Sequence, residues 1–382
     1  MTGDPFFTRL LTALTAPGAG YARSSAPTAT TVLDLGVGEA RYPMPPALCQ
    51  QIGEVAAQTD RLWYSDPRGE IELRQAYLDH LQPHGDAEPS TVLVTAGGKE
   101  AALLALRYLL HAGGGGPVLI PSPGWEPYRF WATAAGARVL GYDPIAVAQN
   151  PNRLRQLIAA AVPRPRVLIL NYPHNPTGVG VEQSKMDEII AVATGFGIGV
   201  VSDEVYRMFG ETSVSAAHAP AYDPARHIVV DSVSKSLAVA GLRVGFLHAY
   251  TPIVDALTAF RGAYASCTSV LAQRVATSLL ISPTAQAWLA DVREQLAASR
   301  TATAAALTDA GIEVVSHGGL YLWCRPPDPS VLPAPGMGAP VTARVTPGVG
   351  FGAADHFRVC TARADLVPRV AAAAVVETMR GR

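Results

Sequence analysis

The sequence predicts an α/β fold in which a mostly parallel, seven-stranded sheet lies between layers of helices. Short apolar runs rich in Val, Ile and Leu alternate with segments of helical periodicity through the first two thirds of the chain. The runs are continuously apolar, which is typical of parallel strands that helices cover on both faces. The seven expected strands are Thr91–Val94, Pro117–Ile120, Arg138–Tyr142, Val167–Asn171, Ile198–Asp203, Ile228–Asp231 and Val244–Leu247.

Helices are expected before, between and after these strands. Helical spacing of apolar residues predicts them at 47–59, 70–80, 97–111, 127–135, 153–162 and 185–194. An Ala-rich segment, 284–309, predicts a helix long enough to bridge two domains.

A length of 382 residues exceeds one ordinary core and indicates two domains. We expect a large domain over 40–285, and a small α+β domain formed by 1–39 together with 286–382. The small domain should contain short strands, a Pro-rich loop at 326–340 and a final helix at 365–380; those strands are Ile312–Val315, Gly319–Cys324, Val341–Val345 and His356–Cys360.

Composition excludes several classes of protein. The formal net charge of −1 gives no electrostatic footprint for nucleic acid or an anionic membrane. No run approaches the roughly 18 apolar residues of a membrane span, and Asp4 and Arg9 interrupt any signal-peptide core. The four cysteines lie far apart, so we expect free thiols, no metal site and a cytoplasmic location.

Two glycine-rich stretches suggest nucleotide binding, but each lacks a feature that the corresponding motif requires. The strand leading into Gly36-Val37-Gly38 resembles the first motif of S-adenosylmethionine-dependent methyltransferases, but three prolines at 43, 45 and 46 forbid the helix that such a loop must open. The Gly113–Gly116 run lacks the Lys-Ser/Thr of a phosphate-binding P-loop.

The stretch from Asp231 to Phe246 carries the clearest chemical signal. A lysine, Lys235, follows a buried strand directly, and it is one of three lysines in the chain. A desolvated lysine with a lowered pKa forms Schiff bases with carbonyl compounds. The hydroxyls of Ser232 and Ser234, with Arg243 further on, suit a phosphate group. Together they suggest pyridoxal 5′-phosphate (PLP), against the simpler alternative of a lysine in a strand-to-helix turn.

Other strand ends add polar and aromatic groups, each with an ordinary structural alternative. Gly97-Gly98-Lys99 at a helix start offers N–H groups to an anion, or is simply a glycine turn. Trp125 could stack on a cofactor ring or pack on the sheet. Asn175 lies in a turn, where its amide could bind a phenolic oxygen. Asp203 ends a buried strand and needs a partner, either a pyridinium nitrogen or a helix N-terminus.

In combination these pieces resemble the class I/II aminotransferase family of fold-type I PLP-dependent enzymes. The resemblance extends from about Leu35 to Arg358. It rests on three motifs in order: Asn175-Pro176-Thr177-Gly178, Ser202-Asp203-Glu204-Val205-Tyr206, and Ser232-Val233-Ser234-Lys235 followed by Gly241-Leu242-Arg243.

The resemblance implies a role for each matching residue. Lys235 would form the Schiff base and then move the Cα proton, while Asp203 would hold the pyridinium nitrogen. Asn175 and Tyr206 would bind the phenolic oxygen of the cofactor, and Trp125 would stack on its ring. The phosphate would lie against Gly97, Gly98, Lys99, Ser232, Ser234 and Arg243.

The resemblance also implies a homodimer with shared active sites. Tyr64 matches a tyrosine that reaches the phosphate of the neighbouring subunit. Arg358 matches the arginine that grips the substrate α-carboxylate, and Gly38 matches a glycine on the substrate side. Amino acids and keto acids are the implied substrates, with no nucleic-acid or membrane partner.

Two departures from the family pattern leave the reaction partly open. The Pro-rich 326–340 segment replaces a helix that family members usually carry, and His174 gives a Pro-His-Asn-Pro string somewhat like that of cystathionine β-lyase-like enzymes. Transamination of an L-α-amino acid is the leading hypothesis; β-elimination, as in a C–S lyase, and decarboxylation are the alternatives.

A transcriptional regulator of the same fold would need a DNA-binding module, for which the first 31 residues are too short. The substrate side chain is not specified; residues that could line its pocket are Tyr21, Arg23, Arg261 and Tyr264.

Overall fold

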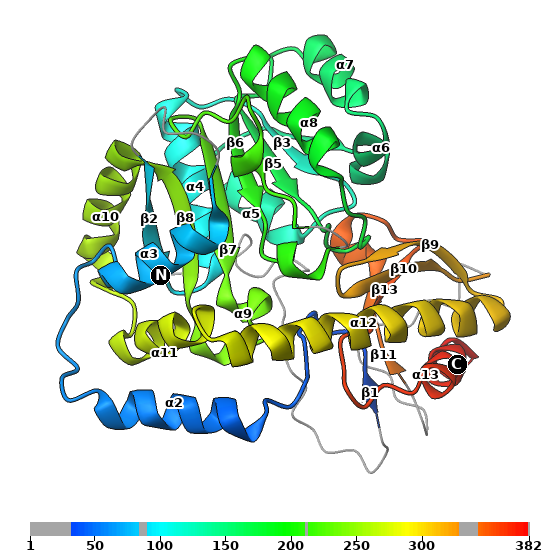
Figure 1. Ribbon diagram of the computed structural model, residues 1–382. Coiled ribbons are helices and arrows are strands. Elements are labelled where there is room, and N and C mark those ends of the chain that lie inside the picture. The colour runs from blue at the N-terminus through cyan, green and yellow to red at the C-terminus, as the bar shows by residue number, and fades with distance from the viewer. Residues whose placement is uncertain (1–31, 84–89, 211–212, 328–342, 381–382) are drawn as a thin grey trace, which may run out of the picture.

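The computed structural model describes residues 32–83, 90–210, 213–327 and 343–380. A seven-stranded sheet in the order β2-β8-β7-β6-β5-β3-β4 forms its centre, with helices on both faces (Figure 1). β8 runs antiparallel to both neighbours and the remaining pairs are parallel, which confirms the predicted α/β fold. The strands are β2 (Ser90–Thr95), β3 (Val118–Pro121), β4 (Val139–Tyr142), β5 (Val167–Asn171), β6 (Gly199–Asp203), β7 (His227–Ser232) and β8 (Gly245–Tyr250).

The continuous apolar runs are explained by the two cores on either side of this sheet. Along β5, Leu168 and Leu170 belong to one apolar cluster and Ile169 to the other. Successive side chains of a strand point to opposite faces, so both faces need apolar residues. The helices of this part are α3 (Ile71–Leu81), α4 (Gly98–Ala112), α5 (Glu126–Ala134), α6 (Pro144–Gln149), α7 (Asn152–Ala160), α8 (Gln183–Gly195), α9 (Val233–Ser236), α10 (Thr251–Ala265) and α11 (Val270–Leu280).

A second, four-stranded antiparallel sheet has its own core. Its order is β12-β13-β10-β9, and its core includes Leu307, Leu322 and Phe357. A parallel two-stranded sheet, β1 with β11, lies beside it. The elements here are β1 (Leu33–Asp34), α12 (Pro283–Asp309), β9 (Glu313–Gly318), β10 (Tyr321–Arg325), β11 (Ala343–Arg344), β12 (Thr346–Pro347), β13 (Phe357–Cys360) and α13 (Pro368–Arg380). The helix α2 (Pro46–Gln58) packs instead on α11, with Leu48 in a core of the large sheet.

The 27-residue helix α12 connects the two cores (Figure 1, yellow). Pro283 occupies its first turn, and the Ser282 hydroxyl accepts a hydrogen bond from the N–H of Ala285, as in an N-cap. Near its start Leu289 packs in the core of the large sheet, whereas Leu307 packs in that of the small sheet. The domain boundary near residue 285 remains a prediction.

Some elements differ from the sequence prediction. Helices α6, α10 and α11 were not predicted; α10 follows β8 directly, and Pro252 in its first turn marks the start of the helix. The strand expected at 341–345 is divided in its described part, with Ala343–Arg344 paired to β1 and the next strand, β12, paired to β13. Most of the predicted Pro-rich loop, 328–340, lies outside the described residues.

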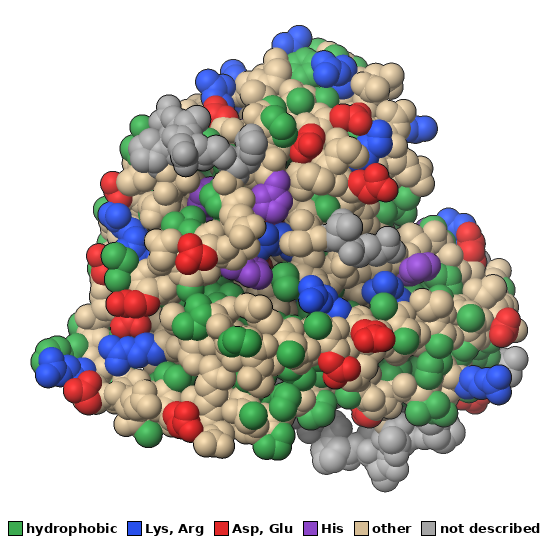
Figure 2. All heavy atoms as spheres, in the orientation of Figure 1, with side chains coloured by type: hydrophobic (Ala, Val, Ile, Leu, Met, Phe, Trp, Pro, Cys, Tyr) green, Lys and Arg blue, Asp and Glu red, His purple; other side chains and the backbone are tan. Residues whose placement is uncertain are grey.

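The surface carries both signs of charge. Lys and Arg side chains are interspersed with Asp and Glu on the face in Figure 2, consistent with the net charge of −1. Within the described ranges no helix has the length and apolar character to cross a membrane, and no group of His, Cys, Asp and Glu could hold a metal ion. The four cysteines, all of them described, are unpaired.

The buried histidine His248 should make the free energy of unfolding depend on pH. His248, on β8, is fully buried between the Tyr222 and Ser90 hydroxyls, and burial lowers its pKa to about 4. Unfolding restores a pKa near 6.5, so the unfolded chain takes up a proton first and stability is lost as the pH falls below that value. Between pH 7 and pH 5 this histidine should cost about 2 kcal/mol of unfolding free energy.

Urea unfolding at the two pH values tests this. The loss of stability should be smaller in His248→Gln than in wild type. The control His111→Gln, at an exposed position in the last turn of α4, should keep the wild-type loss. Equal losses in all three proteins would contradict the prediction.

Candidate active site

A cavity of about 350 Å³ lies at the carboxyl ends of β5, β6 and β7. These strands end at Asn171, Asp203 and Ser232, and ligands gather at this edge of open α/β sheets. Every predicted site residue lines the cavity except Gly97 and Tyr64; the lining residues are Val37, Gly38, Gly98, Lys99, Trp125, Tyr128, Asn171, Asn175, Asp203, Val205, Tyr206, Ser232, Ser234, Lys235, Ala240, Arg243, Tyr321 and Arg358.

Lys235 projects into the cavity from the short helix α9. The Ser232 hydroxyl caps this helix by accepting a hydrogen bond from the N–H of Ser234 at 3.2 Å. Lys235 Nζ donates to the carbonyl oxygen of Gly38 at 2.5 Å. Burial lowers the pKa of the Lys235 amine, and the positive charges of Arg358 and Arg243 act in the same direction. A lowered pKa leaves more of the amine neutral, as a nucleophile or base requires.

Asp203 presents a buried carboxylate at the end of β6. Its Oδ2 accepts a hydrogen bond from the Tyr128 hydroxyl at 2.5 Å, and its side chain is 4% exposed. Burial raises the pKa of Asp203 to about 6, although hydrogen bonds from Tyr128 and from the N–H of Val205 oppose the shift. The group is therefore mostly ionised at neutral pH and favours a cationic partner.

Asn171 joins the ends of two strands to the following turn. Its Nδ2 donates to the carbonyl oxygen of Asp203 at 2.9 Å, and its Oδ1 accepts from the N–H of Asn175 at 2.9 Å. The amide side chain of Asn175 is thereby held beside the cavity, as the sequence predicts.

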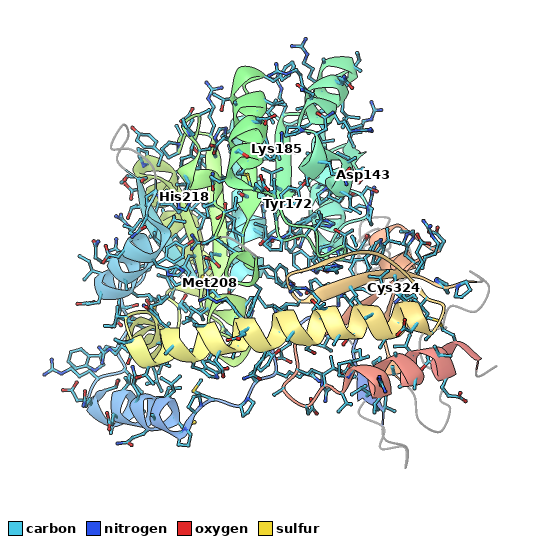
Figure 3. All side chains as sticks on the ribbon, turned by 45° about the vertical axis from the view of Figure 1, so that its right-hand side comes forward. Asp143, Tyr172, Lys185, Met208, His218 and Cys324 are labelled. Carbon is cyan, nitrogen blue, oxygen red and sulfur yellow. The ribbon has the colours of Figure 1, made fainter. Side chains whose placement is uncertain are left out.

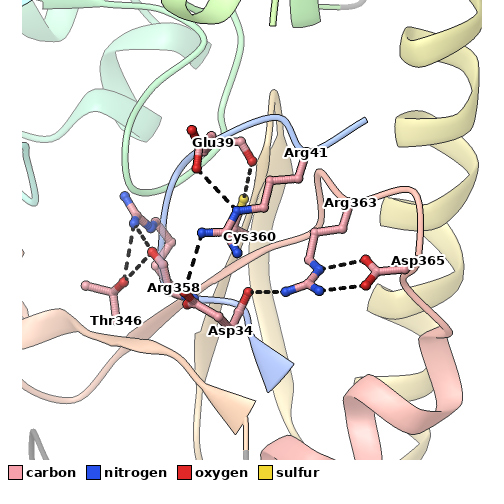
Figure 4. A network of polar contacts seen from close by, with 9 residues as sticks. Asp34, Glu39, Arg41, Thr346, Arg358, Cys360, Arg363 and Asp365 are labelled. Carbon is pink, nitrogen blue, oxygen red and sulfur yellow. Dashed lines mark hydrogen bonds and ion pairs between the residues drawn. The ribbon is translucent and has the colours of Figure 1, made fainter. Parts of the chain in front are cut away.

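Arg358 reaches the cavity from β13 of the four-stranded sheet. Its Nη1 donates to Asn175 Oδ1 at 2.5 Å, and its Nη2 donates to the carbonyl oxygen of Gly36 at 2.5 Å. Figure 4 shows it beside Thr346, whose hydroxyl accepts from Nη2 at 3.3 Å. A guanidinium held with its planar fork in this way is suited to a carboxylate.

The start of α4 forms an anion site together with two hydroxyls and a guanidinium. Ser232 Oγ donates to Ser234 Oγ at 2.9 Å, and Arg243 Nη1 donates to Ser234 Oγ at 3.1 Å. Gly97 has a φ of +93°, and a Cβ there would lie 2.4 Å from Arg243 Nη2. Glycine is thus needed for both the turn and the arginine. N–H groups of a helix start, hydroxyls and Arg bind phosphate well.

Of the three aromatic residues predicted for the site, Trp125 and Tyr206 line the cavity and Tyr64 does not. Trp125 packs edge-to-face on Tyr128 with ring centroids 5.1 Å apart, and Lys99 Nζ lies 5.5 Å from the Trp125 ring. The Tyr206 hydroxyl shares a 2.6 Å hydrogen bond with that of Tyr321. Tyr64 is 87% exposed and does not line this cavity.

The groups present match the parts of PLP. The anion site suits a phosphate, the Asp203 carboxylate suits a protonated pyridine nitrogen, and the Lys235 amine suits an aldehyde. Asn175 and Tyr206 offer an amide and a phenol for a phenolic oxygen. The donor set therefore fits this cofactor.

Six lining residues were not predicted as site residues, and three of them, Tyr128, Asn171 and Tyr321, carry polar groups. Tyr128 lies one helical turn after Trp125, and Asn171 ends a predicted strand, so each had a local signal. Tyr321 had none, because antiparallel pairing of β10 with β13 brings it to the site.

Other residues considered from sequence lie elsewhere. Arg261 Nε and the Tyr264 hydroxyl both donate to Glu100 Oε1, at 3.1 and 2.9 Å, and neither residue lines the cavity. His174 is buried and its Nδ1 lies 2.9 Å from Thr177 Oγ1, and it does not line the cavity. Tyr21 and Arg23 lie outside the described residues.

Comparison with known proteins agrees with the geometry. The family model for aminotransferase class I and II matches residues 30–373. The chain is 29% identical to the glutamate-pyruvate aminotransferase AlaC of Escherichia coli K12, over 84% of this chain and 80% of that protein. It is 30% identical to the probable N-succinyldiaminopimelate aminotransferase DapC of Mycobacterium tuberculosis, over 78% of this chain and 75% of that protein.

A solved structure has the same fold. The aromatic aminotransferase from Pyrococcus horikoshii OT3 superimposes with a TM-score of 0.77 at 24% identity, over 91% of this chain and 95% of that one. The family model covers most of the chain, and the motifs, the fold and the site agree with it. This chain belongs to the class I and II aminotransferase family and is a PLP-dependent aminotransferase.

Proposed function

We propose that the enzyme transfers the amino group of an L-α-amino acid to a keto acid, with Lys235 as the residue that binds the cofactor and moves the proton. The observation that carries this proposal is the Lys235 amine, with a pKa lowered by burial, in one cavity with Asp203 and the anion site. Bound PLP supplies an electron sink that acidifies the Cα–H bond of the amino acid.

The residues of the chain would divide the remaining tasks. Asp203 keeps the pyridine nitrogen protonated, because a buried carboxylate favours a positive partner. Asn175 and Tyr206 bind the phenolic oxygen, and Trp125 packs against the ring. Ser232, Ser234, Arg243 and the start of α4 hold the phosphate.

Arg358 would grip the substrate α-carboxylate. Its acceptors include the Asn175 side chain, the Gly36 carbonyl oxygen and the Thr346 hydroxyl. A carboxylate carries a full charge and accepts two parallel hydrogen bonds, so it competes well for this guanidinium. Relatives of this chain are named as glutamate-pyruvate, aromatic-amino-acid and aspartate aminotransferases, so we propose an L-α-amino acid without specifying its side chain.

We further propose a homodimer in which Tyr64 reaches the neighbouring phosphate site, in a cytoplasmic enzyme. Leu62, Trp63 and Tyr64 are consecutive large side chains that are 67%, 73% and 87% exposed. Burial against a second copy would remove this apolar surface from water. Sedimentation should give a dimer, and Tyr64→Phe should weaken PLP binding; a monomeric active enzyme would contradict the proposal.

The deciding experiment is a half-reaction. The protein is loaded with PLP and mixed with single L-amino acids and sulfur conjugates, without any keto acid. We expect conversion of the cofactor to pyridoxamine phosphate with one equivalent of keto acid. Repeated turnover that releases ammonia and a thiol would instead support β-elimination, and release of carbon dioxide would support decarboxylation.

A further inference from the structure

We propose that Tyr321 is a positioning residue for this reaction: its hydroxyl donates the hydrogen bond that orients and polarises Tyr206, and its ring supports Arg358. The inference deepens the proposed function and rests on it. Tyr321 is 1% exposed and lies on β10, so a side chain from the four-stranded sheet enters the cavity at the end of the large sheet.

The acceptors available to each proton decide which hydroxyl donates in the hydrogen bond between Tyr206 and Tyr321. The two hydroxyls are 2.6 Å apart, and either could donate. Within the described residues, Tyr206 is the one hydrogen-bond partner found for the Tyr321 hydroxyl. If Tyr206 were the donor, the buried proton of Tyr321 would have no acceptor there, at considerable cost. With Tyr321 as the donor, the Tyr206 oxygen is the acceptor of this hydrogen bond, and the Tyr206 O–H can itself donate to the phenolic oxygen of the bound cofactor.

Tyr321 keeps its proton over the working range of pH. Burial raises the pKa of Tyr321 well above its usual value, and the hydrogen bond with Tyr206 adds to the shift. A neutral donor to the Tyr206 oxygen makes Tyr206 itself a stronger donor, because hydrogen bonds in a chain polarise one another. A stronger donor at Tyr206 stabilises negative charge on the phenolic oxygen of the bound cofactor.

The same side chain supports the substrate arginine. The guanidinium carbon of Arg358 lies 4.4 Å from the centroid of the Tyr321 ring, within the range of a cation–π contact. One residue therefore contacts both the phenol proposed for the cofactor and the arginine proposed for the substrate.

Gly38 leaves the space that the Tyr321 hydroxyl needs. A Cβ at position 38 would meet the Tyr321 hydroxyl oxygen far inside van der Waals contact, with the nearest ring carbon at 3.0 Å. The carbonyl oxygen of the same glycine accepts from Lys235 Nζ. The absence of a side chain at residue 38 thus permits the hydroxyl of Tyr321 beside Lys235 and Tyr206.

The test compares Tyr321→Phe with wild type by titrating the visible absorption of the bound cofactor. Loss of one hydrogen bond to Tyr206 should raise the titration midpoint by about 0.5–1 pH unit and lower kcat about 3- to 10-fold, with KM changed less than about twofold. Tyr321→Leu, which also removes the ring, should raise KM for the amino acid a further ~10-fold.

Tyr77→Phe is the matched control. Tyr77 is equally buried, lies outside the cavity, and its hydroxyl has no hydrogen-bond partner among the described residues. It should keep the wild-type midpoint. A double-mutant cycle adds a second measurement: Gly38→Ala should cost less kcat in the Tyr321→Phe background than in wild type, because the closest clash is gone.

The possible outcomes separate failure of the inference about Tyr321 from failure of the proposed function. A midpoint in Tyr321→Phe equal to that of wild type and Tyr77→Phe, in a protein that binds PLP, overturns the inference. Strict additivity in the double-mutant cycle does so independently. If wild-type protein with PLP gives no visible band linked to Lys235, it is the proposed function that fails.

Discussion

Replacing Lys235 with alanine is expected to lower turnover by at least about 10⁴-fold while PLP binding persists. The anion site formed by Ser232, Ser234, Arg243 and the start of α4 does not include the lysine amine, so phosphate affinity should remain. The nucleophile that captures the aldehyde and the base near the Cα proton are both lost. Steady-state transamination and a cofactor-binding titration measure the two effects separately.

The scarcity of lysine makes this result unusually clear. The chain holds three lysines, at positions 99, 185 and 235. Borohydride reduction of the loaded wild type should attach the cofactor to the Lys235 peptide, and mass spectrometry should find no such mass in the alanine variant. Lys185→Ala is the control, since Lys185 lies on α8 away from the cavity and pairs with Glu188 (Figure 3). Turnover of Lys235→Ala within about tenfold of wild type would refute the assignment.

Replacing Asp203 with asparagine should be nearly as damaging. Removing one partner of a buried ion pair costs about 3–5 kcal/mol, which corresponds to roughly 10²- to 10⁴-fold in kcat if the cost appears in the transition state. Tyr128 would then donate to an amide in place of a carboxylate, and the pyridine nitrogen would lose its proton more readily. Pre-steady-state measurement of the half-reaction isolates this step from product release.

Glu204→Gln supplies the matched control for Asp203→Asn. Glu204 is the next residue, is 1% exposed, and accepts hydrogen bonds from the Ser202 hydroxyl and the N–H of Ala216 without lining the cavity. The same change of carboxylate to amide should therefore leave kcat within about threefold of wild type. Similar losses of kcat in both variants would mean that the effect of Asp203→Asn comes from general disruption of buried polar groups and not from a contact with the cofactor.

Several of the residues identified from the sequence share one property, because they lie at a strand end or in an adjoining turn. Asp203, Asn175 and Lys235 follow predicted strands within a few residues, and parallel strands bring their carboxyl ends to one edge. Local pattern and sheet topology together were enough to place them. The anion site likewise combines the start of α4 with the hydroxyls of Ser232 and Ser234 at the end of β7.

What the sequence could not supply depends on contacts between distant elements. Tyr321 reaches the cavity because β10 pairs with β13, at positions where Tyr321 opposes Cys360 and Trp323 opposes Arg358. No local periodicity encodes that register. The helices α10 and α11 were also missed, and they pack on β2 and on α2 and α3 respectively, which are contacts between segments far apart in the sequence.

The helix α12, which joins the two cores, is long enough that a small tilt at one end would produce a large displacement at the other. Leu289 and Leu307 are 18 residues apart, or about 27 Å along a helix that rises 1.5 Å per residue. A tilt of roughly 5° about Leu289 would displace Leu307, and the sheet that carries Arg358, by about 2 Å. Such a displacement exceeds the roughly 0.5 Å within which a binding geometry must be held. The distance between Arg358 and Lys235 thus depends, in part, on side chains packed far from either of them.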